Sequence, residues 1–149
     1  MEAFGFNGDT NEHIFQAMKA LSEAERKWVM SSTSPFEAKK RGRQITMRPD
    51  WNGISRRVML ELNLAKYKQN SSLASALVLT YPQTLVEGNN WGDDYWGAVP
   101  ATEQDRRRVL YPYPASDEHL IWQDDETGLI LVGANWLGRI LMMIRDVIK

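Results

Sequence analysis

The chain has 149 residues, of which 43% are hydrophobic and 25% are charged, and this composition suits one compact domain. It contains no cysteine and two histidines, which excludes a disulfide framework, a thiolate nucleophile and a Cys-based metal site, and argues against a His-built one. No apolar run approaches the roughly 20 residues that a membrane helix requires, and the amino end lacks the layout of a signal peptide, so we expect a cytoplasmic protein with no membrane association.

Charge is distributed unevenly along the chain, although the net charge is only −1. Residues 26–68 contain 11 Lys or Arg against 3 Asp or Glu, which is +8, whereas the remainder contains 7 against 16, which is −9. The basic segment is therefore a candidate for phosphate binding. The alternative is that these side chains only solvate helical surfaces, which is the usual meaning of a charge run.

Capping signatures predict three short helices near the amino end. The pairs with this signature are Asp9 with Glu12, Ser22 with Glu25, and Ser34 with Glu37. The first helix should begin near residue 10 or 11 and end near Leu21. The third should begin at Pro35 and stop at Gly42, because proline suits the first helical position and glycine suits the position after the last.

The rest of the chain predicts further helices and a few short strands. Asp50 should cap a helix over residues 51–69, Ser72 should open a short one, and residues 136–148 form an amphipathic helix. Residues 84–87 read as a short strand. Residues 98–132 look like an insertion that ends in a β-hairpin, with strands at 119–122 and 129–132. We therefore predict a single α+β domain over residues 1–149 that is mostly helical.

Three separate segments combine acidic, amide or aromatic side chains with a short apolar run. They are residues 12–19 (EHIFQAMK), 85–97 (LVEGNNWGDDYWG) and 133–145 (GANWLGRILMMIR). This grouping is expected where a polar pocket is built on the ends of core elements. We therefore expect all three segments to contribute to one site.

The first segment has two interpretations. On a helix, Glu12, Gln16 and Lys19 lie on one side and the apolar residues lie on the other. An ordinary solvent-facing helix has the same pattern, and the helix dipole favours Glu12 in the first turn whatever else it does. His13 could likewise be a packed side chain.

The second segment places Trp91, Tyr95 and Trp96 around two aspartates, Asp93 and Asp94. Flat rings beside carboxylates suit a ligand that has both an aromatic base and a sugar. The alternative is ordinary packing, since tryptophans are more often core residues than ligand platforms.

Eight short motifs occur in a fixed order along the chain. They are E-H-x-F-Q-A-x-K at residues 12–19, P-x-x-A-K-x-x-G-R at 35–43, R-P-D-W at 48–51, V-M at 58–59, K-x-x-Q-N at 66–70, L-V-E at 85–87, D-x-Y-W-G at 93–97 and G-x-N-x-L-G-x-x-L-M-x-x-R at 133–145. Together they resemble the NADAR superfamily, the NAD- and ADP-ribose-associated domain that includes the YbiA-like N-glycosidases. The resemblance covers roughly residues 4–97 and 133–146.

The resemblance implies hydrolysis of an N-glycosidic bond to ribose, in a riboflavin-pathway intermediate or in an ADP-ribosylated nucleobase, with no cofactor and no metal. It assigns catalytic roles to Glu12, Lys19 and Asp93. The substrate contacts that it implies are His13, Phe15, Gln16, Arg43, Arg48, Trp91, Trp96 and Asn135. The expected ligand is an ADP-ribose-like or ribosylated-base small molecule, or ADP-ribosylated DNA or RNA, in a bacterium or a phage-infected cell.

Two routes of catalysis remain open on these residues. In one, Glu12 and Asp93 share the stabilisation of an oxocarbenium-like state and the protonation of the leaving nitrogen. In the other, Lys19 attacks the ring-opened sugar as a neutral amine and forms a Schiff base, which requires a lowered pKa. Arg43 and Arg48 would hold phosphate as bidentate forks, or serve only in capping and solvation.

The sequence departs from the family pattern in two places. The family usually has a strand and an F-L-S-N-F-like loop before the first helix, where this sequence has only a few residues, so we expect a site that is open on that side or completed by another chain. Also, 35 residues separate Gly97 from Gly133, where the family has a few. This insertion is a surface hairpin, a lid over the site or, through the arginines at 106–108, a nucleic-acid contact.

Two other classes of function remain as alternatives. One is a non-catalytic module that binds ADP-ribose or a related nucleotide, and the other is a nucleic-acid-binding protein that uses the basic segment. Loss of turnover with retained ligand binding in Glu12→Gln would favour the enzyme. Strongly salt-dependent binding to bare DNA or RNA would favour the nucleic-acid-binding protein.

Overall fold

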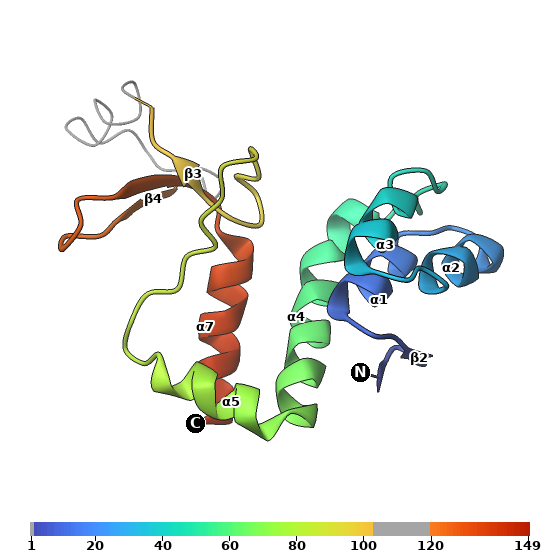
Figure 1. The fold of residues 1–149 in the computed structure, drawn as a ribbon, viewed down its shortest axis with the longest axis horizontal. Coiled ribbons are helices and arrows are strands. Elements are labelled where there is room, and N and C mark those ends of the chain that lie inside the picture. The colour runs from blue at the N-terminus through green and yellow to red at the C-terminus, as the bar shows by residue number, and fades with distance from the viewer. Residues whose placement is uncertain (1, 103–119) are drawn as a thin grey trace. The chain divides into compact units, whose positions relative to one another are not determined.

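The computed structural model describes residues 2–102 and 120–149, which adopt the predicted α+β fold (Figure 1). The described residues form two compact units, one of residues 2–79 with Ile148 and one of residues 80–102 and 120–147 with Lys149. The helices are α1 (Asn11–Met18), α2 (Glu23–Met30), α3 (Pro35–Arg41), α4 (Trp51–Gln69), α5 (Ser71–Leu79) and α7 (Trp136–Ile148). The strands are β1 (Glu2–Ala3), β2 (Phe6–Asn7), β3 (Val99–Pro100), β4 (Leu120–Gln123) and β5 (Ile130–Gly133). Over these described ranges, every helix is too short or too polar to span a bilayer.

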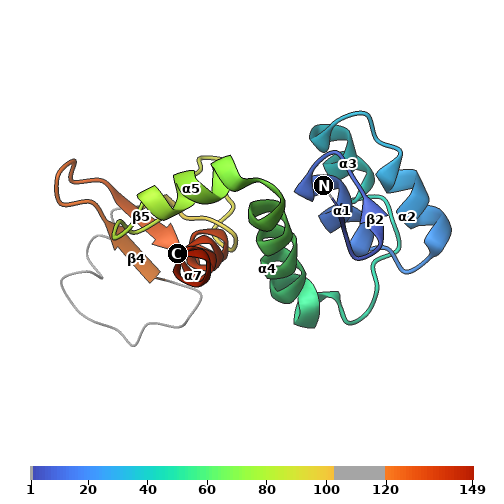
Figure 2. The same cartoon turned by 90° about the horizontal axis from the view of Figure 1, so that it is seen from below.

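In the first unit, α1 is the central helix. It contacts α2, α3 and α4, and Figures 1 and 2 show these four helices gathered together. Ala17 of α1 packs with Val29 of α2 and Ala38 of α3, and all three are fully buried. The short antiparallel pair β1–β2 precedes α1, and β1 lies against α4. The unit is therefore a small helical bundle that surrounds a helix predicted to carry site residues.

The two internal capping boxes of this unit form as predicted. Ser22 Oγ accepts the N–H of Glu25 at 3.2 Å, and Ser34 Oγ accepts the N–H of Glu37 at 3.1 Å. The helix at 51–69 has the predicted bounds, but the prediction that Asp50 caps it is wrong, because the carboxylate of Asp50 pairs with Arg48 instead. The carboxylate thus binds a nearby guanidinium instead of the helix N–H groups, because a charge-assisted hydrogen bond is stronger than a neutral cap.

The first helix ends three residues earlier than predicted, at Met18 rather than Leu21. The reason is a long-range pairing of backbone groups. The N–H of Leu21 donates to the carbonyl oxygen of Thr46 at 2.9 Å, and the N–H of Arg48 donates to the carbonyl oxygen of Lys19 at 2.8 Å. This antiparallel bridge, between Ala20 and Met47, ends the helical path directly after Lys19. It therefore fixes the backbone position of that lysine.

In the second unit, an antiparallel sheet of order β3-β5-β4 leads into α7. The predicted hairpin is confirmed, with Trp122 of β4 opposite Leu131 of β5. Its turn is held by Asp124, whose carboxylate accepts the hydroxyl of Thr127 at 2.6 Å. Strand β3 was not predicted. His119, the expected first residue of the hairpin, and the three arginines at 106–108 lie outside the described residues.

The predicted strand at residues 84–87 is wrong. These residues form no strand. The carbonyl oxygen of Glu87 accepts the N–H of Ala98 at 2.9 Å, and side chains of Asn135 and α7 bind other backbone groups of the segment. Asn135 binds the carbonyl oxygen of Leu85 and the N–H of Glu87, each at 2.9 Å, and the N–H of Leu85 reaches the sulfur of Met142 at 3.5 Å. The sequence did not reveal the hydrogen-bonding partners of this segment, which lie up to 57 positions away.

Candidate functional site

The polar face of α1 forms the core of the candidate site. Gln16 Nε2 donates to Glu12 Oε1 at 2.7 Å, one helical turn away. The charge of Glu12 also acts on Lys19, whose pKa it raises. Gln16 is only 4% exposed, so this face is covered by protein. The interpretation as a solvated helix face therefore does not hold at Gln16.

Lys19 has the electrostatic setting of a reactive amine. Burial lowers the pKa of its ammonium; the carboxylate of Glu12 acts in the opposite direction, and the charges of Lys39 and Arg43 lower the pKa further. The Nζ atom lies 5.6 Å from the centroid of the Phe15 ring, a cation–π contact that by itself favours the ammonium form. Because burial lowers the pKa, the neutral form of this amine is more accessible than that of an exposed lysine.

Phe15 is packed into the core and is not a free platform for a base. Its ring meets that of Trp51 edge to face, with centroids 5.0 Å apart and planes at 64°. Both side chains are buried. In this structure the ring of Phe15 lies beneath the Nζ atom of Lys19, and its predicted role as a ring contact stays a prediction. Trp51 was not among the predicted site residues, although the R-P-D-W motif contains it.

His13 is buried and both of its ring nitrogens have protein partners, and its predicted substrate contact stays a prediction. Its side chain is 1% exposed. Nε2 lies 3.1 Å from the carbonyl oxygen of Ser32, and Nδ1 lies 2.9 Å from Oγ1 of Thr10. Because a carbonyl oxygen only accepts, Nε2 is the donor to Ser32. With both nitrogens used, the predicted substrate contact at His13 has no free polar atom.

The two arginines predicted to bind phosphate differ in whether their guanidinium groups already have a carboxylate partner. Arg48 forms a bidentate pair with Asp50, with Nε–Oδ1 at 2.6 Å and Nη2–Oδ2 at 2.9 Å. The hydrogen bonds raise the pKa of Arg48 and lower that of Asp50. Arg43 is exposed, its charge reaches Lys19, and it has no ion pair within residues 2–102 and 120–149. Arg43 is the better placed of the two to receive an anion.

Asp93 organises the loop of the second unit. Its Oδ1 accepts the N–H of Trp96 at 2.8 Å. The side chain of Asn89, which was not predicted, holds the same turn, because it accepts from the N–H of Asp93 at 3.0 Å and donates to its carbonyl oxygen at 2.6 Å. The geometry thus gives Asp93 a structural duty in addition to any chemical one.

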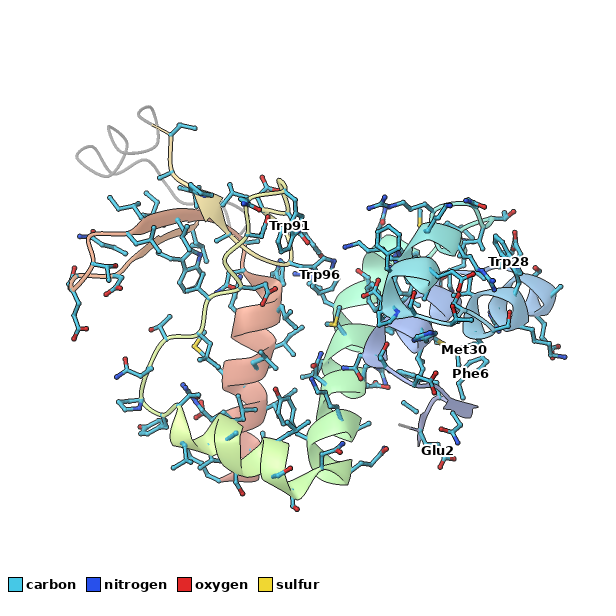
Figure 3. All side chains as sticks on the ribbon, in the orientation of Figure 1. Glu2, Phe6, Trp28, Met30, Trp91 and Trp96 are labelled. Atoms are coloured by element: carbon cyan, nitrogen blue, oxygen red, sulfur yellow. The ribbon has the colours of Figure 1, made fainter. Side chains whose placement is uncertain are left out.

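The aromatic residues of this loop differ in exposure. Trp96 is half-buried and meets Tyr95 edge to face, with centroids 5.1 Å apart. Trp91 is 67% exposed, on the loop before β3 (Figure 3). Trp91 is therefore available for stacking, whereas Trp96 is partly used in packing.

Asn135 is structural. It is fully buried at 0% exposure, and its amide serves the backbone of residues 85–87. Its predicted role as a substrate contact stays a prediction. The neighbouring residues of this motif also have a structural role. The carbonyl oxygens of residues 94–97 accept the N–H groups of residues 134–137 at 2.7–3.1 Å, so the N–H groups at the start of α7 have hydrogen-bond partners.

The site residues thus fall into one cluster in each unit. The first unit brings together Glu12, Phe15, Gln16 and Lys19, with Arg43 nearby. The second unit brings together Asp93, Trp96 and Asn135 through the loop that packs on the start of α7. The expectation that all three segments form one site stays a prediction. Within the part of the chain that the structure describes, no three His, Asp or Glu side chains are grouped so as to hold a metal ion.

Known proteins with similar sequences and folds agree with this architecture. The chain is 37% identical over 90 residues to the N-glycosidase YbiA of Escherichia coli, a match that spans 59% of this chain and 56% of that protein. It is 26% identical over 145 residues to an N-glycosidase of Nostoc punctiforme, spanning 94% of this chain and 74% of the relative. The NMR structure of E. coli YbiA superposes with a TM-score of 0.68 at 27% identity, covering 99% of this chain and 71% of that one. The NADAR domain model matches residues 5–149, and the chain therefore belongs to the NADAR domain family.

Proposed function

We propose that this protein is an N-glycosidase that hydrolyses the bond between a base and ribose. The observation that carries the proposal is the Glu12–Gln16–Lys19 cluster, in which a carboxylate and a desolvated amine share one helix face. The N-glycosidases of E. coli and N. punctiforme support the reaction class. The matched segment spans little more than half of the E. coli relative. We therefore base the proposed activity on the side-chain cluster as well as on the family.

Glu12 suits the stabilisation of positive charge on the sugar. Its Oε1 is held by Gln16 at 2.7 Å, which orients the carboxylate before any substrate arrives. Cleavage of an N-glycosidic bond passes through an oxocarbenium-like state, and a carboxylate fixed beside C1′ stabilises the developing charge without reorganisation. In this route, water adds to C1′ and the base leaves with a proton.

Lys19 suits a covalent route on the same substrate. The neutral amine adds to C1 of the ring-opened sugar, and the base departs as its protonated form, which leaves a Schiff base on Nζ. Water then hydrolyses the Schiff base, so that the sugar is released and the amine is restored. A lowered pKa provides the neutral amine that the first step requires, and it is the feature that favours this route.

The substrate that we propose is a ribosylated base that carries phosphate, either a riboflavin-pathway intermediate or an ADP-ribosylated nucleobase. The charges of Lys39 and Arg43 lie close enough to Lys19 to affect its pKa, so an anionic group beside the amine would be attracted. ADP-ribose attached to DNA or RNA belongs to the same class of substrate.

Release of sugar from defined substrates tests the proposal. The purified protein is incubated with a guanine-linked ADP-ribosylated oligonucleotide, with NAD and with the ribosylamino-pyrimidine of riboflavin synthesis, and products are followed by mass spectrometry. We expect release from at least one substrate and its loss in Glu12→Gln and Lys19→Ala. The matched controls are Glu23→Gln and Lys27→Ala, which remove the same charges from an exposed pair on α2. Binding of ADP-ribose without release from any substrate would overturn the enzyme in favour of the binding module.

Borohydride added during turnover separates the two routes. Reduction of a Schiff base would leave a sugar adduct on the peptide that contains Lys19, with a mass that identifies the transferred group. An active enzyme that gives no adduct, but still requires Glu12, would support the oxocarbenium route.

A further inference from the structure

Gly42, directly after α3, lies against the amide of Gln16. An added Cβ at this glycine would lie 2.0 Å from Gln16 Oε1, 2.8 Å from its Cδ and 3.0 Å from its Cβ. The backbone itself does not require glycine, because Gly42 has φ −61° and ψ −10°, ordinary right-handed values that any residue adopts. The expected reason for this glycine was a helix stop, but the observed reason is the space that Gln16 occupies.

The amide of Gln16 has one orientation consistent with its partner. Its Nε2 donates to the carboxylate of Glu12, which only accepts, so the oxygen must lie on the other side of the amide. That side faces Gly42, where Oε1 is buried and has no hydrogen-bond partner among the described residues. The hydrogen bond to Glu12 is thus kept although the amide oxygen is left without one of its own.

The contact between Gly42 and Gln16 connects the end of α3 to the side chains on the polar face of α1. The N–H of Gly42 donates to the carbonyl oxygen of Ala38 at 2.8 Å, and Ala38 is part of the buried cluster that joins the first three helices. The position of Gly42 is therefore fixed by core packing. A side chain at this point would chiefly displace the amide of Gln16, which is its nearest and most flexible neighbour, whereas the Cβ of Gln16 at 3.0 Å would have to shift by only a few tenths of an ångström.

We propose that Gly42 is a positioning residue: the missing side chain lets Gln16 hold one oxygen of Glu12 and so aims the carboxylate at the sugar. The proposal rests on the proposed function, because Glu12 is the group that touches substrate. Gly42 itself touches none of the reacting atoms. Its effect passes through two contacts, from Gly42 to Gln16 and from Gln16 to Glu12.

A double-mutant cycle tests this chain of contacts. Gly42→Ala should reduce kcat about 10- to 100-fold with little change in KM, because misplacement of a catalytic group by about 1 Å costs on this scale. Gln16→Ala should give a similar loss. In the Gln16→Ala protein, Gly42→Ala should cause little further loss, since the amide that the methyl group displaces is absent and the only one of the three contacts that remains is the Cβ of residue 16 at 3.0 Å. Gly53→Ala is the control, because a Cβ at Gly53 meets no atom within 4 Å.

Additive losses in the double variant would overturn the proposal, and so would wild-type kcat in Gly42→Ala. If Gly42→Ala fails to fold, the double variant decides the question, because removal of the Gln16 side chain should restore the fold. A double variant that also fails to fold would overturn the proposal, since the collision would then involve more than Gln16.

A measurement that needs no turnover keeps this proposal separate from the proposed function. In ¹⁵N-edited NMR spectra, the side-chain NH₂ signals of Gln16 should shift in Glu12→Gln and in Gly42→Ala, and should stay in place in Gly53→Ala. Signals that Gly42→Ala leaves unchanged would overturn the positioning role even in an active enzyme. A wild-type protein without turnover whose Gln16 signals respond to Gly42→Ala would overturn only the proposed function.

Discussion

The side-chain amide of Asn135 does for Leu85 what a neighbouring strand would do. Its Nδ2 donates to the carbonyl oxygen of Leu85 at 2.9 Å, and its Oδ1 accepts the N–H of Glu87 at 2.9 Å. Asn135 has φ 50°, in the left-handed region that asparagine tolerates better than most residues. One buried side chain therefore satisfies two backbone groups and also makes the turn into α7.

Asn135→Ala should lower the free energy of unfolding by about 2–5 kcal/mol. The variant leaves two buried backbone groups without partners and places alanine at a positive φ, and each unsatisfied group costs about 1–3 kcal/mol. Urea denaturation followed by tryptophan fluorescence measures the change. Asn52→Ala, at an exposed position of α4, is the control and should change stability by less than about 0.5 kcal/mol. Equal stabilities of the two variants would contradict the structural role of Asn135.

Lys19→Met should abolish turnover and make the protein more stable at neutral pH. Burial holds the pKa of Lys19 below its ordinary value of 10.5, so the unfolded chain binds this proton more tightly than the folded chain. The charged lysine therefore costs stability at neutral pH, and that cost disappears as pH rises through the folded-state pKa towards 10.5.

The urea midpoints of Lys19→Met and the wild-type protein should therefore be furthest apart at pH 7 and converge as pH approaches 10.5. Lys68→Met, at an exposed position in the last turn of α4, serves as the control for the added apolar group. A Lys19→Met protein that is less stable than the wild type at pH 7 would contradict the lowered pKa.

Arg43→Ala should weaken substrate binding more than Arg48→Ala. The guanidinium of Arg48 is already bound bidentately by Asp50, whereas Arg43 is exposed and its charge reaches Lys19. A lost charge-assisted contact to phosphate corresponds to roughly a tenfold or larger rise in KM or Kd. Calorimetric titration with ADP-ribose compares the two variants, and a larger effect of Arg48→Ala would show that substrate displaces Asp50.

Glu37→Gln should remove part of the acid sensitivity of the first unit. The carboxylate of Glu37 accepts the N–H and hydroxyl of Thr33 and pairs with Arg41. These hydrogen bonds, those to Thr33 first, lower the pKa of Glu37 to about 2 from an ordinary value of 4.5. Because the folded-state pKa is depressed, this stabilisation is present above pH 4.5 and is lost as pH falls towards about 2.

Urea midpoints between pH 2 and pH 6 test this expectation. The wild-type advantage over Glu37→Gln should be greatest near pH 6 and should vanish near pH 2. Asp125→Asn, in the exposed hairpin turn, controls for the loss of one negative charge. An advantage that stays constant across this range would show that Glu37 acts through shape alone.

Local signals in the sequence predicted much of the secondary structure. In the Ser22 and Ser34 capping boxes and in the turn at Asp124, the hydrogen-bond partners lie within four residues of each other. A short stretch of sequence is therefore enough to predict them. Spacing along α1 likewise placed Glu12, Gln16 and Lys19 on one face. The order of the eight motifs was sufficient to identify the family.

The tertiary structure decided what each of these side chains does. Asn135 and Leu85 are 50 positions apart, and His13 reaches Ser32 across 19 positions, so no local pattern shows that their polar atoms are already used. Gly42 reads as a helix stop because the neighbour that excludes a side chain, Gln16, lies on another helix. By itself the sequence determined the elements, the family and the candidate residues, because these depend on spacing and order. Which candidates keep free polar atoms depended on contacts between distant segments, which only the folded chain creates.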